Sequence, residues 1–272
     1  MTLSRNLVAA SLTPVTALHQ AVRPGIRVLM YHRVSVQPAG DQLTVAPALF
    51  TRQMDILARS CRVVSLDRAV AELDQERVQP AVAITFDDGY RDFLTQALPV
   101  LRRFGLPATI FVTTRFSDQT AAHPRYPNTD DRLHLDWSEL RELAASQDIT
   151  IGSHTVSHPF LPALERAASW QEIADSRRLL QDRLDLPIDF FCYPSGGHGP
   201  REVDHVAKAG FRAAVTTAPG LNRNLHRPFE LTRTEITHKD GELAFRMKLA
   251  GGFDPLHALL RFVRANSRPS AS

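Results

Sequence analysis

The chain has 272 residues, of which 43% are hydrophobic and 22% charged, a balance that excludes wholesale disorder, a collagen-like repeat and a coiled coil. Its 32 Lys and Arg residues against 29 Asp and Glu give a net charge of +3. No basic run of the kind that neutralises a phosphate backbone is present, so we expect no nucleic-acid partner. Two cysteines, Cys61 and Cys192, are too few for a disulfide framework, and the sequence leaves open whether they pair.

The first 22 residues contain one arginine and a weak apolar segment that Pro14 interrupts. A signal peptide has a cleaner apolar core and a small-residue cleavage site, so we expect a cytoplasmic rather than a secreted protein and an N-terminal arm or short helix over residues 1–22. No stretch reaches the ~18–20 apolar residues of a membrane span, and we expect no transmembrane segment. Residues 266–272 have the composition of a disordered tail, which leaves residues 23–265 for a single domain. The oligomeric state stays open.

Strand-like and helix-like segments alternate from residue 26 onward. Short apolar runs rich in β-formers predict strands at 26–31, 62–65, 81–86, 108–113, 149–152, 188–194, 211–217 and 231–237. Segments with apolar residues at helical spacing predict helices at 46–60, 66–73, 91–105, 137–146, 163–184, 201–210 and 242–251. Repeated strand–helix units indicate a parallel sheet with right-handed crossovers. Seven or eight units over ~250 residues favour a closed or nearly closed barrel over an open doubly wound sheet.

Chemistry in such a barrel lies where the strands end and the loops to the helices begin. Four strand ends are unusually polar: Tyr31–Arg33, Thr85–Tyr90, Gly152–His158 and Phe191–Gly197. We expect all four to project onto the same face. No G-x-G-x-x-G follows the first strand and no G-x-x-x-x-G-K-[ST] occurs, which disfavours a nucleotide-binding sheet.

Asp87 and Asp88 are adjacent acids directly after a buried strand, where a charge is costly without a partner. One interpretation is that they cap the following helix. The other follows from the extended chain, on which neighbouring side chains point in different directions. One carboxylate could then hold a metal while the other handles a proton.

His154 and His158 are four residues apart, a spacing that brings two imidazoles to one face of a helical turn. An isolated H-x-x-x-H is a weak signal. Two histidines and a carboxylate from another strand end, however, form a facial triad with open positions for water and substrate. Zinc suits this set, although ligand identity alone does not exclude iron, cobalt, nickel or manganese.

These motifs resemble the NodB-homology polysaccharide deacetylases, carbohydrate esterase family four. ITFDDGY and GSHTVSHPFL match the first two motifs of that family in order and spacing. VLMYHRV, FFCYPSGG and FRAAVTTAPGLN resemble the branch that contains poly-N-acetylglucosamine deacetylases. The resemblance covers residues 26–250 and implies a distorted (β/α)7 barrel. It also implies that Asp87 is the catalytic base, and that Asp88, His154 and His158 bind one divalent metal.

The chain departs from the family pattern at two positions. Cys192 stands where the third motif often carries an arginine that braces the base. The fifth motif, a Leu-His that supplies the catalytic acid, has no clear match. Leu256-His257 has the right letters but falls in a predicted terminal helix, so we expect His257 to be a surface or packing residue. His32 ends the first strand and is the better-placed acid, its alternative being a buried histidine bonded to the backbone.

The expected reaction is metal-dependent removal of N-acetyl groups from N-acetylglucosamine units of an oligo- or polysaccharide, with release of acetate. The substrate class comes from the resemblance. An oxyanion would be held by a backbone N–H near Tyr193, Pro194 and Ser195. Two other functions stay open: an amidase for a small non-sugar amide, and a catalytically weak glycan-binding relative. A groove lined by aromatic side chains would favour the glycan, whereas a closed pocket would favour the small molecule. Tyr126, in the long insertion 114–136, could stack on a sugar ring.

Overall fold

A seven-stranded parallel sheet forms the centre of the molecule in a computed structural model that describes residues 2–36, 41–75, 78–119 and 132–259. The strand order is β8-β7-β6-β5-β4-β1-β9. The strands are β1 (Ile26–Tyr31), β4 (Ala81–Phe86), β5 (Ala108–Val112), β6 (Ile149–Ser153), β7 (Phe190–Cys192), β8 (Ala213–Val215) and β9 (Arg233–Glu235). A separate two-stranded sheet pairs β2 (Arg33–Val34) with β3 (Thr44–Val45).

The two edges of the large sheet approach each other and nearly close it into a barrel. Val215 of β8 forms an isolated parallel bridge with Leu231, two residues before β9. The N–H of Leu231 donates to the Ala214 carbonyl and the N–H of Thr216 donates to the Leu231 carbonyl, both at 2.9 Å. This arrangement confirms the predicted distorted (β/α)7 barrel. The strand expected at 62–65 is reduced to one bridge between Val63 and Val82.

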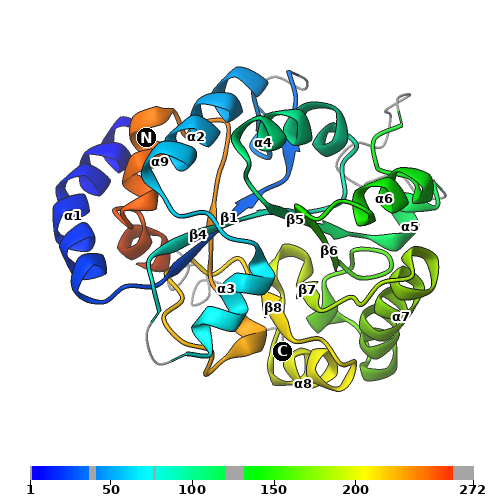
Figure 1. Cartoon of the computed structure of the whole chain (residues 1–272). Helices are drawn as coiled ribbons and strands as arrows, with labels where there is room; N and C mark the ends of the chain where they lie inside the picture. The colour runs from blue at the N-terminus through cyan, green and yellow to red at the C-terminus, as the bar shows by residue number, and fades with distance from the viewer. Residues whose placement is uncertain (1, 37–40, 76–77, 120–131, 260–272) are drawn as a thin grey trace.

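Helices surround the sheet (Figure 1). They are α2 (Pro47–Ser60), α3 (Leu66–Leu73), α4 (Leu98–Phe104), α5 (Thr114–Ser117), α6 (Trp137–Ala144), α7 (Arg166–Leu184) and α8 (Pro200–Lys208). Their ends follow local chemistry: Ser65 accepts the N–H of Arg68 at the start of α3, and Gly105 ends α4 with φ +63°. The helix expected at 91–105 opens instead with a π-turn, Phe93–Ala97. Pro99 lacks the N–H that a regular α-helical turn would use there.

Alternate residues of β1 face two different apolar clusters, as the two-residue period of a strand requires. Leu29 and Tyr31 belong to the cluster that includes Phe50 of α2. Ile26 and Val28 belong to the cluster that includes α3. Because both faces of the strand are covered, the whole of β1 is apolar except Arg27.

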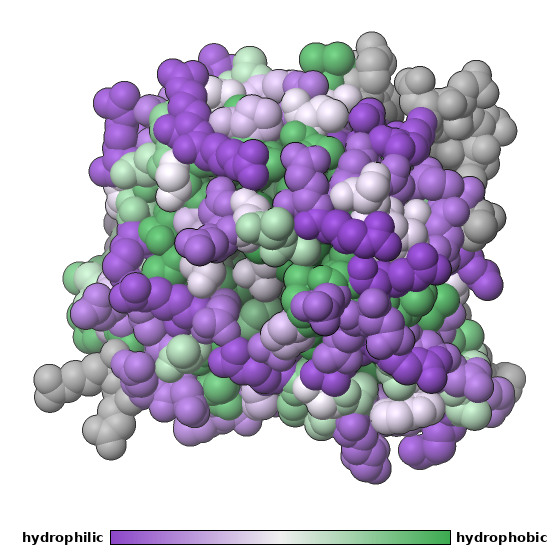
Figure 2. Space-filling model, turned by 45° about the vertical axis from the view of Figure 1, so that its right-hand side comes forward, coloured by the Kyte–Doolittle hydropathy of each residue, from purple (hydrophilic) through white to green (hydrophobic). Residues whose placement is uncertain are grey.

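The N-terminal segment forms a helix, α1 (Thr2–Val22), which lies beside α9 (Glu242–Leu249) at one side of the barrel (Figure 1). Ala9 is buried against Ala244, Met247 and Phe253. No helix among the described residues is long and apolar enough to span a membrane. The face seen after a turn of 45° from the view of Figure 1 is mainly hydrophilic, with hydrophobic areas between the polar side chains (Figure 2). The tail expected at 266–272 lies outside the described residues.

Candidate active site

Asp88, His154 and His158 lie together at the carboxyl ends of β4 and β6. The Nε2 atoms of both histidines are 3.3 Å from the same oxygen, Oδ1 of Asp88. The two rings are 4.8 Å apart between centroids and nearly perpendicular, at 73°. Asp88 and His154 are buried and His158 is partly exposed. One potential ligand atom from each residue is therefore within 4.8 Å of the other two.

His154 and His158 come together through a loop, and the prediction of a helical turn between them is wrong. Residues 154–158 have no helical assignment, and Thr155 and His158 have φ of +69° and +62°. The Thr155 hydroxyl oxygen accepts the N–H of His158 at 3.0 Å, which closes the turn. Glu172 of α7 accepts the N–H groups of Val156 and Ser157, both at 2.9 Å. Side-chain hydrogen bonds thus replace the helical bonds that the H-x-x-x-H spacing suggested.

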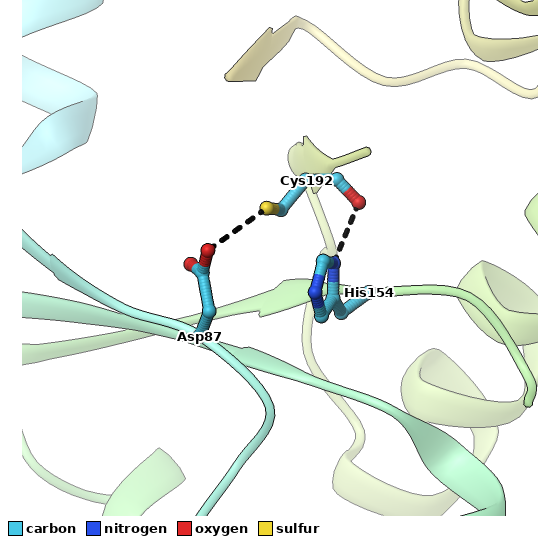
Figure 3. Close-up of side chains that lie close together, drawn as sticks. All are labelled: Asp87, His154 and Cys192. Atoms are coloured by element: carbon cyan, nitrogen blue, oxygen red, sulfur yellow. Dashed lines mark hydrogen bonds between the residues drawn. The ribbon is translucent and has the colours of Figure 1, made fainter. Parts of the chain in front are cut away.

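The hydrogen bonds of His154 suit a metal site. Its Nδ1 lies 2.7 Å from the carbonyl oxygen of Cys192, which can only accept, so Nδ1 carries the proton (Figure 3). In the neutral ring Nε2 then presents a lone pair to the Asp88 carboxylate. Two lone pairs at 3.3 Å repel unless a proton or a cation lies between them. Metal-binding histidines characteristically donate their other N–H to a carbonyl in this way.

The pKa shifts of His154 and Asp88 also favour a positive charge in this cluster. Burial disfavours the charged ring of His154, but the adjacent Cys192 side chain and the hydrogen-bonded Asp88 carboxylate together outweigh it and raise the pKa of His154 well above its ordinary value. Burial likewise opposes ionisation of Asp88, and the neighbouring histidines overcome it and lower the pKa of this carboxyl group. A positive charge among these three side chains is therefore favourable, and a divalent cation fits the set.

Asp87 is held by an arginine that sequence reasoning missed. Arg233 of β9 is buried and donates Nη1 to Oδ1 and Nη2 to Oδ2 of Asp87, both at 2.7 Å. Its Nε donates to the Thr216 carbonyl at 2.9 Å. Burial raises the pKa of Asp87, but the charge of Arg233 more than offsets it, so the pKa lies below its usual value. The only sequence signal was an arginine inside an otherwise strand-like run, LTRTEIT.

Cys192 occupies the space beside this ion pair, where the family often has an arginine. Its Sγ lies 3.5 Å from Oδ2 of Asp87 (Figure 3). The same Sγ lies 3.2 Å from Nη2 of Arg233. Burial raises the pKa of the Cys192 thiol, so it stays protonated and donates to Asp87. Cys61 and Cys192 are both free. Asp87, His154 and Cys192 form a second group of potential ligands, but the Arg233 cation already neutralises Asp87 and disfavours a metal there.

His32 comes to the same site from the end of β1. Its Nε2 lies 4.0 Å from Oδ2 of Asp87, and its side chain is 13% exposed. Nδ1 is buried, with no hydrogen-bond partner among the described residues. A buried polar atom without a partner is costly unless water or a ligand reaches it. His32 is therefore beside Asp87 and not packed beneath the sheet.

Two other histidines have different surroundings. His198 lies near the carbonyl of Gly196 through Nδ1, at 2.9 Å, and its ring stacks on Tyr193 at 4.8 Å. His257 accepts from Arg5 of α1 at 3.0 Å. Burial, together with the nearby Lys248 and Arg5 charges, lowers the pKa of His257 to about 4. His257 thus joins α1 to the rest of the molecule.

Two of the three residues expected to hold an oxyanion, Tyr193 and Pro194, have no free N–H in the turn after β7. Pro194 has no N–H, and the N–H of Tyr193 donates to the Val215 carbonyl at 3.3 Å. Within this described turn, that leaves the N–H of Ser195 as the candidate donor. Ser195 has φ +54° and Gly196 φ +69°. This left-handed conformation strains Ser195, whereas Gly196 adopts it freely because it has no side chain. Strain at a residue such as Ser195 is common where a site is preorganised.

A cleft of about 880 Å³ adjoins these residues. Arg233 lies in its wall together with Ser195, Gly197 and His198. Arg5 of α1 and His257 also line it, whereas Asp88, His154 and His158 are not among its lining residues. The volume is in the upper part of the range for ligand sites, roughly 300–1,000 Å³.

Tyr126 lies outside the described residues. His134, from the same insertion, packs between the rings of Tyr90 and Phe116.

The chain is similar in sequence to known and putative deacetylases. The chain is 29% identical over 213 residues to the "Putative polysaccharide deacetylase YxkH" of Bacillus subtilis (strain 168), a match that covers 77% of this chain and 71% of that protein. It is 33% identical over 174 residues to the poly-beta-1,6-N-acetyl-D-glucosamine N-deacetylase of Escherichia coli (strain K12), covering 53% of this chain and 26% of that protein.

Among solved structures, the Streptococcus pyogenes deacetylase PplD in complex with acetate superimposes with a TM-score of 0.73 at 24% identity, over 83% of this chain and 98% of that one. This likeness shows the fold. A family model described as polysaccharide deacetylase matches residues 74–214, just over half of the chain. The chain therefore belongs to the polysaccharide deacetylase family.

Proposed function

We propose that this protein is a metal-dependent hydrolase that removes N-acetyl groups from N-acetylglucosamine units of an oligo- or polysaccharide and releases acetate. The observation that carries the proposal is the pair of adjacent carboxylates in different surroundings. Asp88 faces two histidines, whereas Asp87 faces a buried arginine and a third histidine. One carboxylate is thus suited to a metal and the other to proton transfer.

Asp88, His154 and His158 would hold one divalent ion, with zinc as the first choice for one carboxylate and two imidazoles. Such an ion would polarise the acetamide carbonyl and make water more acidic. Cobalt, nickel, iron and manganese accept the same donor types, so the metal content must be measured.

Asp87 would act as the general base. Its carboxylate is kept ionised by Arg233, and it accepts a proton from water as the water oxygen attacks the acetamide carbon. The N–H of Ser195 would donate to the developing oxyanion. His32 would donate a proton to the nitrogen as the C–N bond breaks, so that the products are acetate and a free amino sugar.

The cleft supports a glycan as substrate over a small amide. It has a volume of about 880 Å³ and is lined by Arg233, which pairs with Asp87, and also by Arg5 of α1, whereas neither of the two carboxylates is among its lining residues. The relative from Escherichia coli is named for poly-beta-1,6-N-acetyl-D-glucosamine, although this chain spans only about a quarter of that protein. An N-acetylglucosamine polymer is the substrate that we propose on these grounds.

The test combines metal analysis with acetate release from β-1,6-linked N-acetylglucosamine oligomers. We expect about one divalent ion per chain, loss of activity on chelation and recovery on adding the metal back. Asp87→Asn should keep the metal and lose turnover by ~10²–10⁴-fold, the usual contribution of a general base. No acetate release by the metal-loaded protein would overturn the proposal, and full activity of Asp87→Asn would move the base to another residue.

A further inference from the structure

We infer that Phe160 is a platform on which a pyranose ring of the glycan stacks, and that it makes this protein select oligomers over single acetamido sugars. The inference rests on the proposed function for the identity of the ligand. Phe160 is two residues beyond His158, and it lines the cleft together with Ser195, Gly197 and His198. A sugar unit next to the one being deacetylated would meet this side chain.

The exposure of Phe160 is unusual for its place. Phe160 is 46% exposed, although a phenylalanine normally buries its ring. Phe253 also lines the cleft but is only 3% exposed. An apolar ring left open in the wall of a polar cleft favours a ligand that brings both apolar C–H faces and hydroxyl groups, as a pyranose does.

The backbone around Phe160 is fixed, so the ring is presented from a firm base. The next residue, Leu161, is fully buried, and its carbonyl accepts from Nη2 of Arg201 at 3.0 Å. The Phe160 carbonyl accepts the N–H of Ala163 at 3.0 Å. Little ordering of this segment is then needed when a ligand binds, which favours affinity.

Gly197 supports one side of the ring. A Cβ at position 197 would lie 2.7 Å from Cδ2 of Phe160 and still nearer to Cε2. Gly197 itself has φ −73° and ψ +110°, a conformation that any residue adopts. The absence of a side chain at 197 is therefore required by the closeness of the Phe160 ring and not by the backbone. Gly197 gives the ring a flat support at one edge of the cleft.

The experiment measures binding separately from hydrolysis. The dissociation constants of a β-1,6-linked N-acetylglucosamine pentasaccharide and of N-acetylglucosamine are measured by calorimetry on metal-loaded Asp87→Asn protein, in which we expect turnover to be too slow to consume the ligand during the titration. Phe160→Leu is then introduced because it keeps an apolar side chain against Gly197 but removes the aromatic face. We expect weaker pentasaccharide binding by roughly 3- to 10-fold, the range of ring-face interactions, with little change for the monosaccharide.

Three variants serve as controls. Phe160→Tyr keeps the ring and should bind as the parent does. Gly197→Ala keeps Phe160 but displaces its ring, and should weaken pentasaccharide binding. Trp170→Leu removes another exposed aromatic, 37% exposed on α7 and outside the cleft, and should change nothing. Phe160→Leu is also made in the protein that keeps Asp87. Its metal content and its hydrolysis of 4-nitrophenyl acetate check that the substitution leaves the metal site intact.

Each outcome decides between the claims. Equal pentasaccharide affinity in Phe160→Leu and its parent refutes the platform, as does an equal loss for monosaccharide and pentasaccharide. If Phe160→Leu selectively weakens pentasaccharide binding but the protein with native Asp87 releases no acetate, the platform is supported and the proposed function is refuted. No binding of either sugar refutes both.

Discussion

Asp87 contacts three different side chains, and together they define what it can do. Arg233 holds both carboxylate oxygens, which fixes the orientation of the group and keeps it charged. Cys192 is small enough to leave room for the arginine and donates its thiol proton to Oδ2. His32 lies 4.0 Å from the same oxygen. A carboxylate with this support can accept a proton without moving.

Arg233→Lys should keep the fold and the metal but reduce kcat by roughly 10- to 100-fold. Lysine retains the charge but cannot hold both oxygens, so Asp87 loses its fixed orientation and part of the ~10²–10⁴-fold that a general base contributes. Steady-state kinetics on the oligosaccharide checks this, with metal content measured in parallel.

The matched control is Arg27→Lys. Arg27 is as buried as Arg233 and pairs with Asp254 at 3.0 Å, but it lies outside the active site. Its replacement should lower the melting temperature and leave kcat unchanged. An Arg233→Lys enzyme with normal kcat would show that the ion pair serves stability alone.

His32→Ala should depress turnover on the acetamide far more than on 4-nitrophenyl acetate. The amine must be protonated as it leaves, and general acid catalysis is worth ~10²–10⁴-fold, whereas nitrophenolate leaves without a proton. Parallel kinetics on the two substrates is the measurement. Equal losses on both would assign His32 a packing role and leave the acid to another group.

The loop between β6 and α7 explains why local spacing was an incomplete guide. The four-residue interval correctly predicted that His154 and His158 would meet. It could not reveal that Glu172, on the following helix, would bind the loop and give Thr155 and His158 left-handed backbone angles. A similar limit applies to α1, because its contacts with α9 join segments more than 200 residues apart.

Gly252→Ala should loosen α1 from the barrel. A Cβ at 252 would lie 2.8 Å from the Ala9 carbonyl oxygen and closer still to the Thr13 hydroxyl. Overpacking of this kind costs about 1–3 kcal/mol, so we expect a lower melting temperature and faster proteolysis within residues 1–22. Gly241→Ala is the control, because nothing lies within 4 Å of its Cβ position and it should behave as wild type. Equal protease resistance of the two variants would contradict the close approach.

The barrel brings the site together from β1, β4, β6, β7 and β9. Because all seven strands are parallel, their carboxyl ends share one rim. Asp87 and Arg233 are 146 residues apart in sequence, yet they pair because β4 and β9 both flank β1. Near-closure through Val215 and Leu231 carries β9 back toward β8, where Arg233 reaches Cys192.

The sequence by itself determined the alternation of strands and helices, the barrel class, and the nearness of Asp88, His154 and His158. Those features depend on apolar periodicity and on the rule that parallel strands end on one rim. The tertiary structure decided which cation holds Asp87. Arg233 has this role because two strands distant in the chain, β4 and β9, bring Asp87 and Arg233 into the same buried space. No local sequence pattern predicts that these two residues meet.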